Sequence, residues 1–112
     1  MERVIYSFGS FEFDDELMQL RRSDKVVRLE LVSRRVLAML LRRAGELVTK
    51  DDLLLEVWEG RNVADNCVTV AMARLRKALD TANDDGDFVL TLYGRGYRFV
   101  GAVVAHPSVI EG

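Results

Sequence analysis

Apolar and polar residues alternate in short runs over the first thirty positions of the chain. Turn residues separate these runs, which cover residues 4–8, 11–13, 17–22 and 26–29. A period of two with one apolar face is typical of strands that bury one side of a sheet. The pattern therefore predicts an N-terminal antiparallel β-meander.

Beyond these runs the apolar period lengthens to that of a helix. A first helix is predicted after Ser33 as its N-cap, with Ala44-Gly45 at its C-terminal end. A second helix is predicted after Thr49 as its N-cap, where two aspartates in the first turn interact favourably with the helix dipole. It continues to Trp58, and Gly60 ends it.

A third helix is predicted from a cap at Asp65 or Asn66 to about Leu79, after a loop over residues 59–64. On a helical wheel, the buried stripe consists of Val68, Met72, Leu75 and Leu79. The outward arc consists of Asn66, Thr69, Val70, Ala73, Arg74 and Lys77, with Arg76 at its edge.

A β-hairpin is predicted after an acidic and polar loop at residues 81–87. Its strands cover residues 88–92 and 97–100, and the turn between them holds two glycines that flank Arg95. Glycine accepts positive φ, so an arginine can stand at the tip. The order of elements predicts an α+β winged helix-turn-helix domain over residues 1–103, followed by a tail or the start of a linker at 104–112.

The composition indicates one folded domain, since 49% of the 112 residues are hydrophobic and 30% are charged. One cysteine and one histidine exclude a disulfide framework and a metal site of several imidazoles. The chain has no glycine-rich phosphate loop and no HExxH motif, so no enzyme, cofactor or small-molecule site is predicted. Neither a membrane span nor a signal peptide is predicted, and the expected location is the cytoplasm.

Charge is unevenly distributed along the chain. The formal net charge is −2, yet residues 61–79 carry a net +3, residues 89–101 a net +2 and residues 80–88 a net −4. DNA affinity depends on a local cationic face rather than on overall charge. From charge alone, a solvated helix face is the simpler explanation. Arg95 at the hairpin tip adds weight to DNA binding, because minor-groove arginines occupy such tips.

The sequence resembles the DNA-binding effector domain of OmpR/PhoB-type bacterial transcription regulators over about residues 6–101. Three segments carry the resemblance: LVTKDDLL with VW at 47–54 and 57–58, Val68 with LRKAL at 75–79, and GRGYRF at 94–99. Their order and spacing are together specific. WEGR at 58–61 and GRGYRFVG at 94–101 are most similar to regulators that carry this domain at the N-terminus.

The resemblance implies that the third helix enters the major groove of double-stranded DNA and that the hairpin, as a wing, contacts the minor groove. It implies binding to direct repeats as a homodimer. It also implies contact with RNA polymerase through the loop before the third helix, which consists of Glu59, Gly60, Arg61, Asn62, Val63 and Ala64.

The candidate DNA-binding residues form three groups. Base edges are assigned to Asn66, Thr69, Ala73 and Arg74, with Val70 as a small apolar contact to thymine methyls. Phosphates are assigned to Thr49, Lys50, Arg76, Lys77 and, from the resemblance, the backbone N–H of Trp58. The minor groove is assigned to the wing residues Tyr93, Arg95 and Arg98.

A second hypothesis is a winged-helix adaptor for protein interaction or dimerisation, without strong DNA binding. The acidic overall charge and the small residues on the outward arc favour it, and the basic wing disfavours it. Salt-dependent DNA binding separates the two hypotheses.

Overall fold

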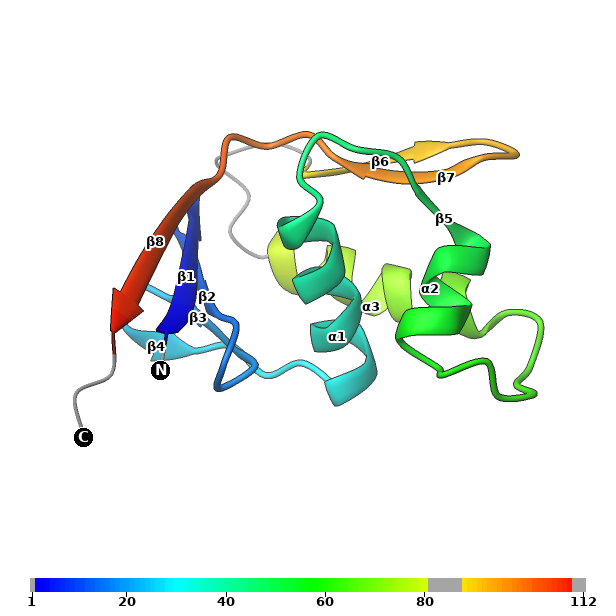
Figure 1. Cartoon of the computed structure of the whole chain (residues 1–112), viewed down its shortest axis with the longest axis horizontal. Coiled ribbons are helices and arrows are strands. Elements are labelled where there is room, and N and C mark those ends of the chain that lie inside the picture. Colours follow the sequence, from blue (N-terminus) through cyan, green and yellow to red (C-terminus); the bar gives the residue numbers. More distant parts are fainter. Residues whose placement is uncertain (1, 81–87, 110–112) are drawn as a thin grey trace.

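Figure 1 shows the fold as a computed structural model, which describes residues 2–80 and 88–109. A five-stranded sheet lies at one end beside three helices, and a three-stranded sheet lies toward the other end. In chain order the elements are β1 (Glu2–Phe8), β2 (Phe11–Asp14), β3 (Gln19–Arg22), β4 (Lys25–Val26), α1 (Leu31–Arg42), β5 (Val48–Thr49), α2 (Lys50–Glu56), α3 (Cys67–Asp80), β6 (Val89–Leu92), β7 (Gly96–Phe99) and β8 (Val104–Val109). The predicted α+β fold is confirmed.

The N-terminal sheet has the strand order β4-β3-β2-β1-β8, and neighbouring strands are antiparallel. Its inner face is apolar because alternate residues point toward the helices, where Tyr6, Phe8, Phe11, Phe13 and Leu20 are buried. This arrangement confirms the predicted meander. The fourth strand of the meander is shorter than the predicted run 26–29, since β4 ends at Val26 and residues 27–29 lead into α1.

The C-terminal segment differs from the sequence prediction. Residues 104–109, which the pattern assigns to a tail, form β8 and pair with β1 from Glu2↔Val109 to Ser7↔Val104. In the sequence, Pro107 suggests a linker, because proline has no backbone N–H to donate. An edge strand such as β8 tolerates proline, since one side of its backbone has no neighbouring strand. The folded unit therefore includes β8, past the expected boundary at residue 103.

The first helix begins two residues before the predicted cap. Glu30 occupies the N-cap position of α1, and Ser33 lies inside the helix and is fully buried. The Ser33 hydroxyl donates a 2.9 Å hydrogen bond to the carbonyl oxygen of Ala71 on α3. The prediction of Ser33 as an N-cap is therefore wrong, because its hydroxyl has a partner on another helix.

The second helix begins as predicted. The Thr49 hydroxyl accepts from the backbone N–H of Asp52 at 3.0 Å, and the Asp52 carboxylate accepts from the backbone N–H of Thr49 at 3.0 Å. This reciprocal pair is a capping box. The helix ends at Glu56, before the predicted Trp58, and Gly60 follows with a φ of +70°.

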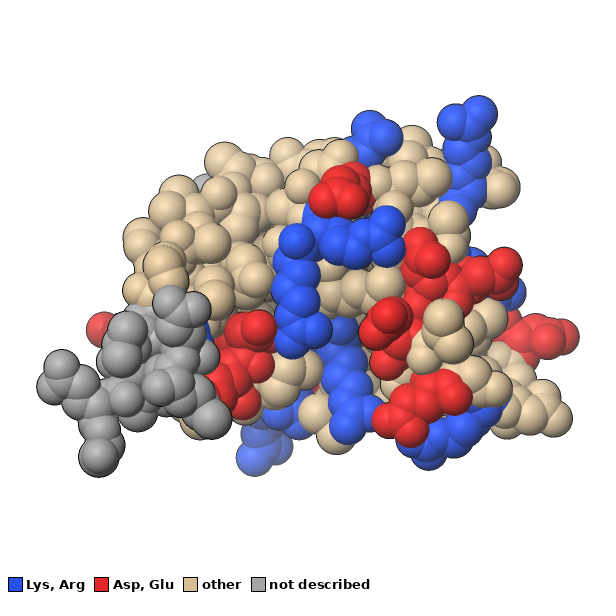
Figure 2. Space-filling view, viewed as in Figure 1, with Lys and Arg blue, Asp and Glu red and all other residues tan. Residues whose placement is uncertain are grey.

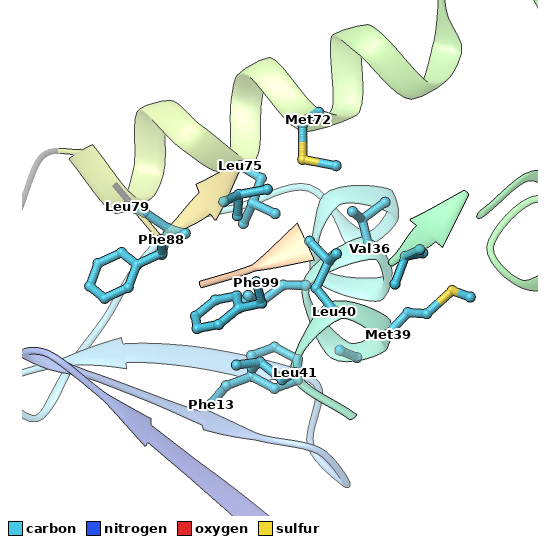
Figure 3. Close-up of a cluster of buried hydrophobic side chains, with 14 of the residues drawn as sticks. Phe13, Val36, Met39, Leu40, Leu41, Met72, Leu75, Leu79, Phe88 and Phe99 are labelled. Atoms are coloured by element: carbon cyan, nitrogen blue, oxygen red, sulfur yellow. The ribbon is translucent and has the colours of Figure 1, made fainter. Parts of the chain in front are cut away.

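The third helix begins at Cys67, and its predicted stripe of Val68, Met72, Leu75 and Leu79 is buried. Figure 3 shows Met72, Leu75 and Leu79 directed toward α1 and the three-stranded sheet. Phenylalanine rings join the two sheets: Phe8 lies 5.3 Å from both Phe88 and Phe99, measured between ring centroids. Among the described residues, no helix has the length and apolarity needed to cross a membrane.

The wing, defined as β6, β7 and the turn at 93–95, is anchored by a strand that the sequence did not reveal. This strand, β5, pairs with β7 through Val48↔Tyr97 and Thr49↔Gly96. Gly96 has a φ of +151°, and a Cβ there would lie 2.2 Å from the carbonyl oxygen of Val48. Only glycine allows the two backbones to approach so closely. The predicted loop at 81–87 lies outside the described residues.

Candidate nucleic-acid interface

A groove of about 560 Å³ separates α3 from the wing. Its walls come from three distant parts of the sequence: the start of α2, one flank of α3 and the inner face of the wing. The predicted site residues that it brings together are Lys50, Thr69, Arg76, Tyr93 and Arg95. The helix-turn-helix and the wing therefore share one concave surface.

The outward arc of α3 is exposed as the helical wheel predicts. The exposed residues are Asn66, just before the helix, and Thr69, Val70, Ala73, Arg74 and Lys77. Thr69 lies on the flank that faces the wing, whereas Arg74 and Lys77 line a second groove against residues 27–30. The exposed ridge of α3 is thus bordered by a concave surface on each side.

Arg74 contacts an acid from another element. Its Nη1 lies 2.5 Å from Oε2 of Glu30, the N-cap residue of α1. Both side chains remain more than half exposed, at 54% and 60%. An exposed pair of this kind contributes at most about 1 kcal/mol, so Arg74 can exchange Glu30 for another partner.

Arg76 is partly buried and faces the wing. Its Nη2 donates to the carbonyl oxygen of Val89 at 3.0 Å and to the Thr91 hydroxyl at 2.5 Å. The guanidinium carbon also lies 5.8 Å from the centre of the Tyr97 ring, within the range of a cation–π contact. In the free domain this predicted phosphate ligand is held by both strands of the wing.

The start of α2 presents a polar edge to the groove. Thr49 uses its hydroxyl oxygen as the acceptor of the capping box, so its hydroxyl proton is left to donate to an anion. Lys50 is exposed, and its Nζ lies 3.4 Å from the carbonyl oxygen of Asp65. The hydrogen bonds from Thr49, and then the Arg43 guanidinium, hold the pKa of the Asp52 carboxyl below its usual value of 3.8.

The turn between α2 and α3 is mostly exposed, as a contact loop requires. Within residues 59–64 only Val63 is partly covered, and Glu59 pairs with Arg61 at 3.1 Å. Trp58, just before the loop, is half-buried and packs against the core. Its ring therefore has a packing role, and only its backbone N–H remains a candidate for a phosphate.

The tip of the wing projects into solvent. The backbone N–H of Arg95 donates to the carbonyl oxygen of Leu92 at 2.8 Å, which closes the turn one residue earlier than the sequence predicts. Gly94 supplies the positive φ of +75° that the turn needs. Tyr93 is 93% exposed and Arg95 is also exposed, so both predicted tip residues are free to touch a ligand.

Arg98 does not join this surface. Strand alternation in β7 directs Tyr97 and Arg98 to opposite faces, and Tyr97 faces the groove. Arg98 pairs with Leu90 across the ladder on the outer face and is partly buried. The structure therefore separates Arg98 from the other candidate residues.

Sequence reasoning missed three residues at this interface. Thr91 lines the groove and contacts Arg76, and the Tyr97 ring contacts the same guanidinium. The predicted strands do not place them on one face, because the observed turn is one residue shorter and pairs Thr91 with Tyr97. Glu30, the partner of Arg74, lies 44 positions away in the sequence, and no local pattern indicates that pairing.

Charge is unevenly distributed over the surface of the domain. Figure 2 shows the face that carries α1 and α2, where acidic and basic side chains are interspersed and acidic atoms gather over α2. Basic atoms project from the wing end of the same face. The wing strands and their turn, residues 89–99, contain two arginines and no acid. The wing is therefore basic throughout, without a neighbouring acid in its own sequence.

Comparisons with known proteins agree with this geometry. Residues 24–99 match the family model described as "Transcriptional regulatory protein, C terminal". The transcriptional regulator HilA of Salmonella typhimurium is 38% identical over 105 residues, covering 90% of this chain and 19% of HilA. The chain thus spans about a fifth of the length of that relative.

Solved structures share the fold. The DNA-binding domain of Escherichia coli CadC aligns with a TM-score of 0.80 over 95% of this chain and 100% of that domain, at 23% identity. The Klebsiella pneumoniae RstA DNA-binding domain, solved in complex with the RstA box, aligns with a TM-score of 0.70 over 86% and 96% of the two chains, at 31% identity. The chain therefore belongs to the OmpR/PhoB-type family of DNA-binding domains of transcription regulators.

Proposed function

We propose that this chain binds double-stranded DNA in a sequence-specific manner, as the DNA-binding domain of a bacterial transcription regulator. The observation that carries the proposal is the shared concave surface between the exposed ridge of α3 and a wing that ends in Arg95. A helix of 14 residues is about 21 Å long and about 10–12 Å wide, which fits a major groove about 12 Å wide. The adjacent wing tip then faces the minor groove.

The exposed side chains divide the work on DNA. We assign base edges to the exposed surface of α3 and the residue just before it, where Asn66, Thr69, Ala73 and Arg74 are exposed. Val70 supplies an apolar surface for thymine methyls. We assign phosphates to Thr49, Lys50 and Lys77 and to the backbone N–H of Trp58, and the minor groove to Tyr93 and Arg95.

The test is fluorescence anisotropy with a labelled pool of random duplexes at two salt concentrations, about 50 and 200 mM. We expect binding that falls steeply with salt and collapses in the double variant Arg95→Ala/Lys77→Ala. Selection from the same pool then yields the preferred site. Absence of binding at the lower salt, by a chain that circular dichroism shows to be folded, would favour the adaptor hypothesis instead.

The proposal also covers partners, catalysis and location. The exposed loop at 59–64 is a contact surface for RNA polymerase, and direct-repeat sites are occupied by two copies of the domain. The domain acts without catalysis, in the cytoplasm. In the intact regulator, replacing Glu59 and Arg61 by alanine should reduce transcription and leave DNA affinity unchanged. A matching loss of DNA affinity would assign the loop to DNA rather than to polymerase.

A further inference from the structure

Arg76 reaches across the groove and contacts both strands of the wing. On β6 it donates to the Val89 carbonyl and the Thr91 hydroxyl, and on β7 it lies over the Tyr97 ring. On β6 the two acceptors are two residues apart, since Val89 accepts through its backbone carbonyl and Thr91 through its side-chain hydroxyl. Together with the Tyr97 ring on β7, they give the guanidinium contacts at three points of the wing.

We propose that Arg76 is a positioning residue that sets the angle between wing and α3, so that Arg95 reaches the minor groove while α3 occupies the major groove. This inference rests on the proposed function and deepens it. Arg95 lies four residues beyond Thr91. A small rotation at the contact therefore displaces the arginine at the tip. The contact to DNA is made by Arg95, and Arg76 acts through the wing.

The chemistry of the contact requires a guanidinium. A single nitrogen, Nη2, donates to both oxygens, and the planar guanidinium can at the same time stack on the aromatic face of Tyr97. An ammonium keeps the positive charge but is a compact point donor without a planar face. Arg76→Lys therefore keeps the positive charge and removes the planar contact with the Tyr97 ring, which weakens the hold on the wing.

The decisive experiment measures how much Arg95 contributes to DNA affinity in two backgrounds of the full chain, on the duplex selected from the random pool. In the wild-type background we expect Arg95→Ala to weaken binding roughly tenfold. In the Arg76→Lys background the same change should cost less than roughly twofold, because the wing tip no longer reaches the groove. Arg74→Lys is the matched control on the opposite flank of α3, and there Arg95→Ala should keep its full cost.

The outcomes separate the inference from the proposed function. If Arg95→Ala has no effect in the wild-type background, the minor-groove assignment fails. If it costs the same in the wild-type and Arg76→Lys backgrounds, the positioning role is overturned and Arg76 binds phosphate alone. Thr91→Val removes one acceptor of the Arg76 contact without changing any charge. It should also reduce the cost of Arg95→Ala to DNA affinity, and it serves as the test if Arg76→Lys does not fold.

A second readout needs no DNA. Spin labels at Tyr93→Cys and Ala73→Cys, in a Cys67→Ser background, report the distance between the wing tip and α3. Both positions are exposed in the wild-type domain. We expect the distance distribution to broaden in Arg76→Lys and to stay narrow in Arg74→Lys. An unchanged distribution in Arg76→Lys would overturn the proposal even if the domain binds DNA as expected.

Discussion

Arg74 and Glu30 form an ion pair between α3 and the N-cap position of α1, with Nη1 of the arginine 2.5 Å from Oε2 of the glutamate. The arginine proposed to read base edges is thus held by an acid while the domain is free. Under the proposed assignment, DNA displaces Glu30 before Arg74 reaches a base. We therefore expect Glu30 to compete with DNA for the same guanidinium.

This competition predicts that Glu30→Gln raises affinity for the preferred duplex. An exposed ion pair contributes about 0.2–1 kcal/mol, which corresponds to a gain of about 1.5- to 5-fold in anisotropy titrations. Removal of any acid from a DNA-facing surface also raises affinity. The comparison is therefore repeated in the Arg74→Ala background. A gain of the same size without Arg74 would show that Glu30 acts by general repulsion alone.

Arg74 and Lys77 are expected to differ in what they recognise. Arg74→Ala should weaken the preferred duplex more than random duplexes, because a base contact contributes about 1–3 kcal/mol of discrimination. Lys77→Ala should weaken binding to both kinds of DNA alike and lower the slope of log affinity against log salt by about 1. The measurement is the ratio of the two affinities for each variant. Equal losses on both duplexes from Arg74→Ala would remove Arg74 from the base-reading set.

The root of the wing should tolerate no side chain at Gly96. Gly96→Ala places a Cβ 2.2 Å from the Val48 carbonyl oxygen, at a φ of +151°. We expect a loss of about 2–4 kcal/mol in the free energy of unfolding, measured with urea. Gly94→Ala is the control, since it has a positive φ of +75° but no atom within 4 Å of the added Cβ. It should cost about 1–2 kcal/mol, and an equal loss at both sites would refute steric overlap as the cause.

The α2 capping box predicts a dependence of stability on pH. Folding lowers the pKa of Asp52, so its carboxylate stabilises the domain fully above its ordinary value of 3.8, and this contribution is lost as the pH falls through the lowered pKa. Asp52→Asn should therefore be less stable than wild type at neutral pH and approach it as the pH falls below 3.8. Urea unfolding across this range tests it. Asp51→Asn, at the exposed neighbouring carboxylate, should not reproduce this convergence.

Local periodicity carried much of the fold in the sequence. Val68, Met72, Leu75 and Leu79 repeat at the helical period over 12 positions, so one face of α3 could be identified as buried. The capping box at Thr49 is also local, because both partners lie within four residues. Features of this kind need no knowledge of the rest of the chain.

The features that were missed depend on distant partners. The strand β5 has two residues, too few to show a period, and it exists because Gly96 allows β7 to approach. Serine is a common N-cap residue, but the hydroxyl of Ser33 instead bonds the carbonyl of Ala71, 38 positions away. The same holds for the interface, where the helical wheel separates Arg74 from Arg76 but does not show that their partners are Glu30 and the wing.

Thr49 belongs to two structural elements at once, since it pairs with Gly96 at the root of the wing and caps α2 through Asp52. The wing and α2, the helix before α3, are therefore joined at a single residue. Such a joint restrains the spacing between the wing and the helix-turn-helix, so the domain has a nearly fixed span. Under the proposed function, we expect duplexes whose groove widths already match that span to bind undistorted and the others to bend or twist at a cost of a few kcal/mol, so that DNA stiffness contributes to the choice of sequence.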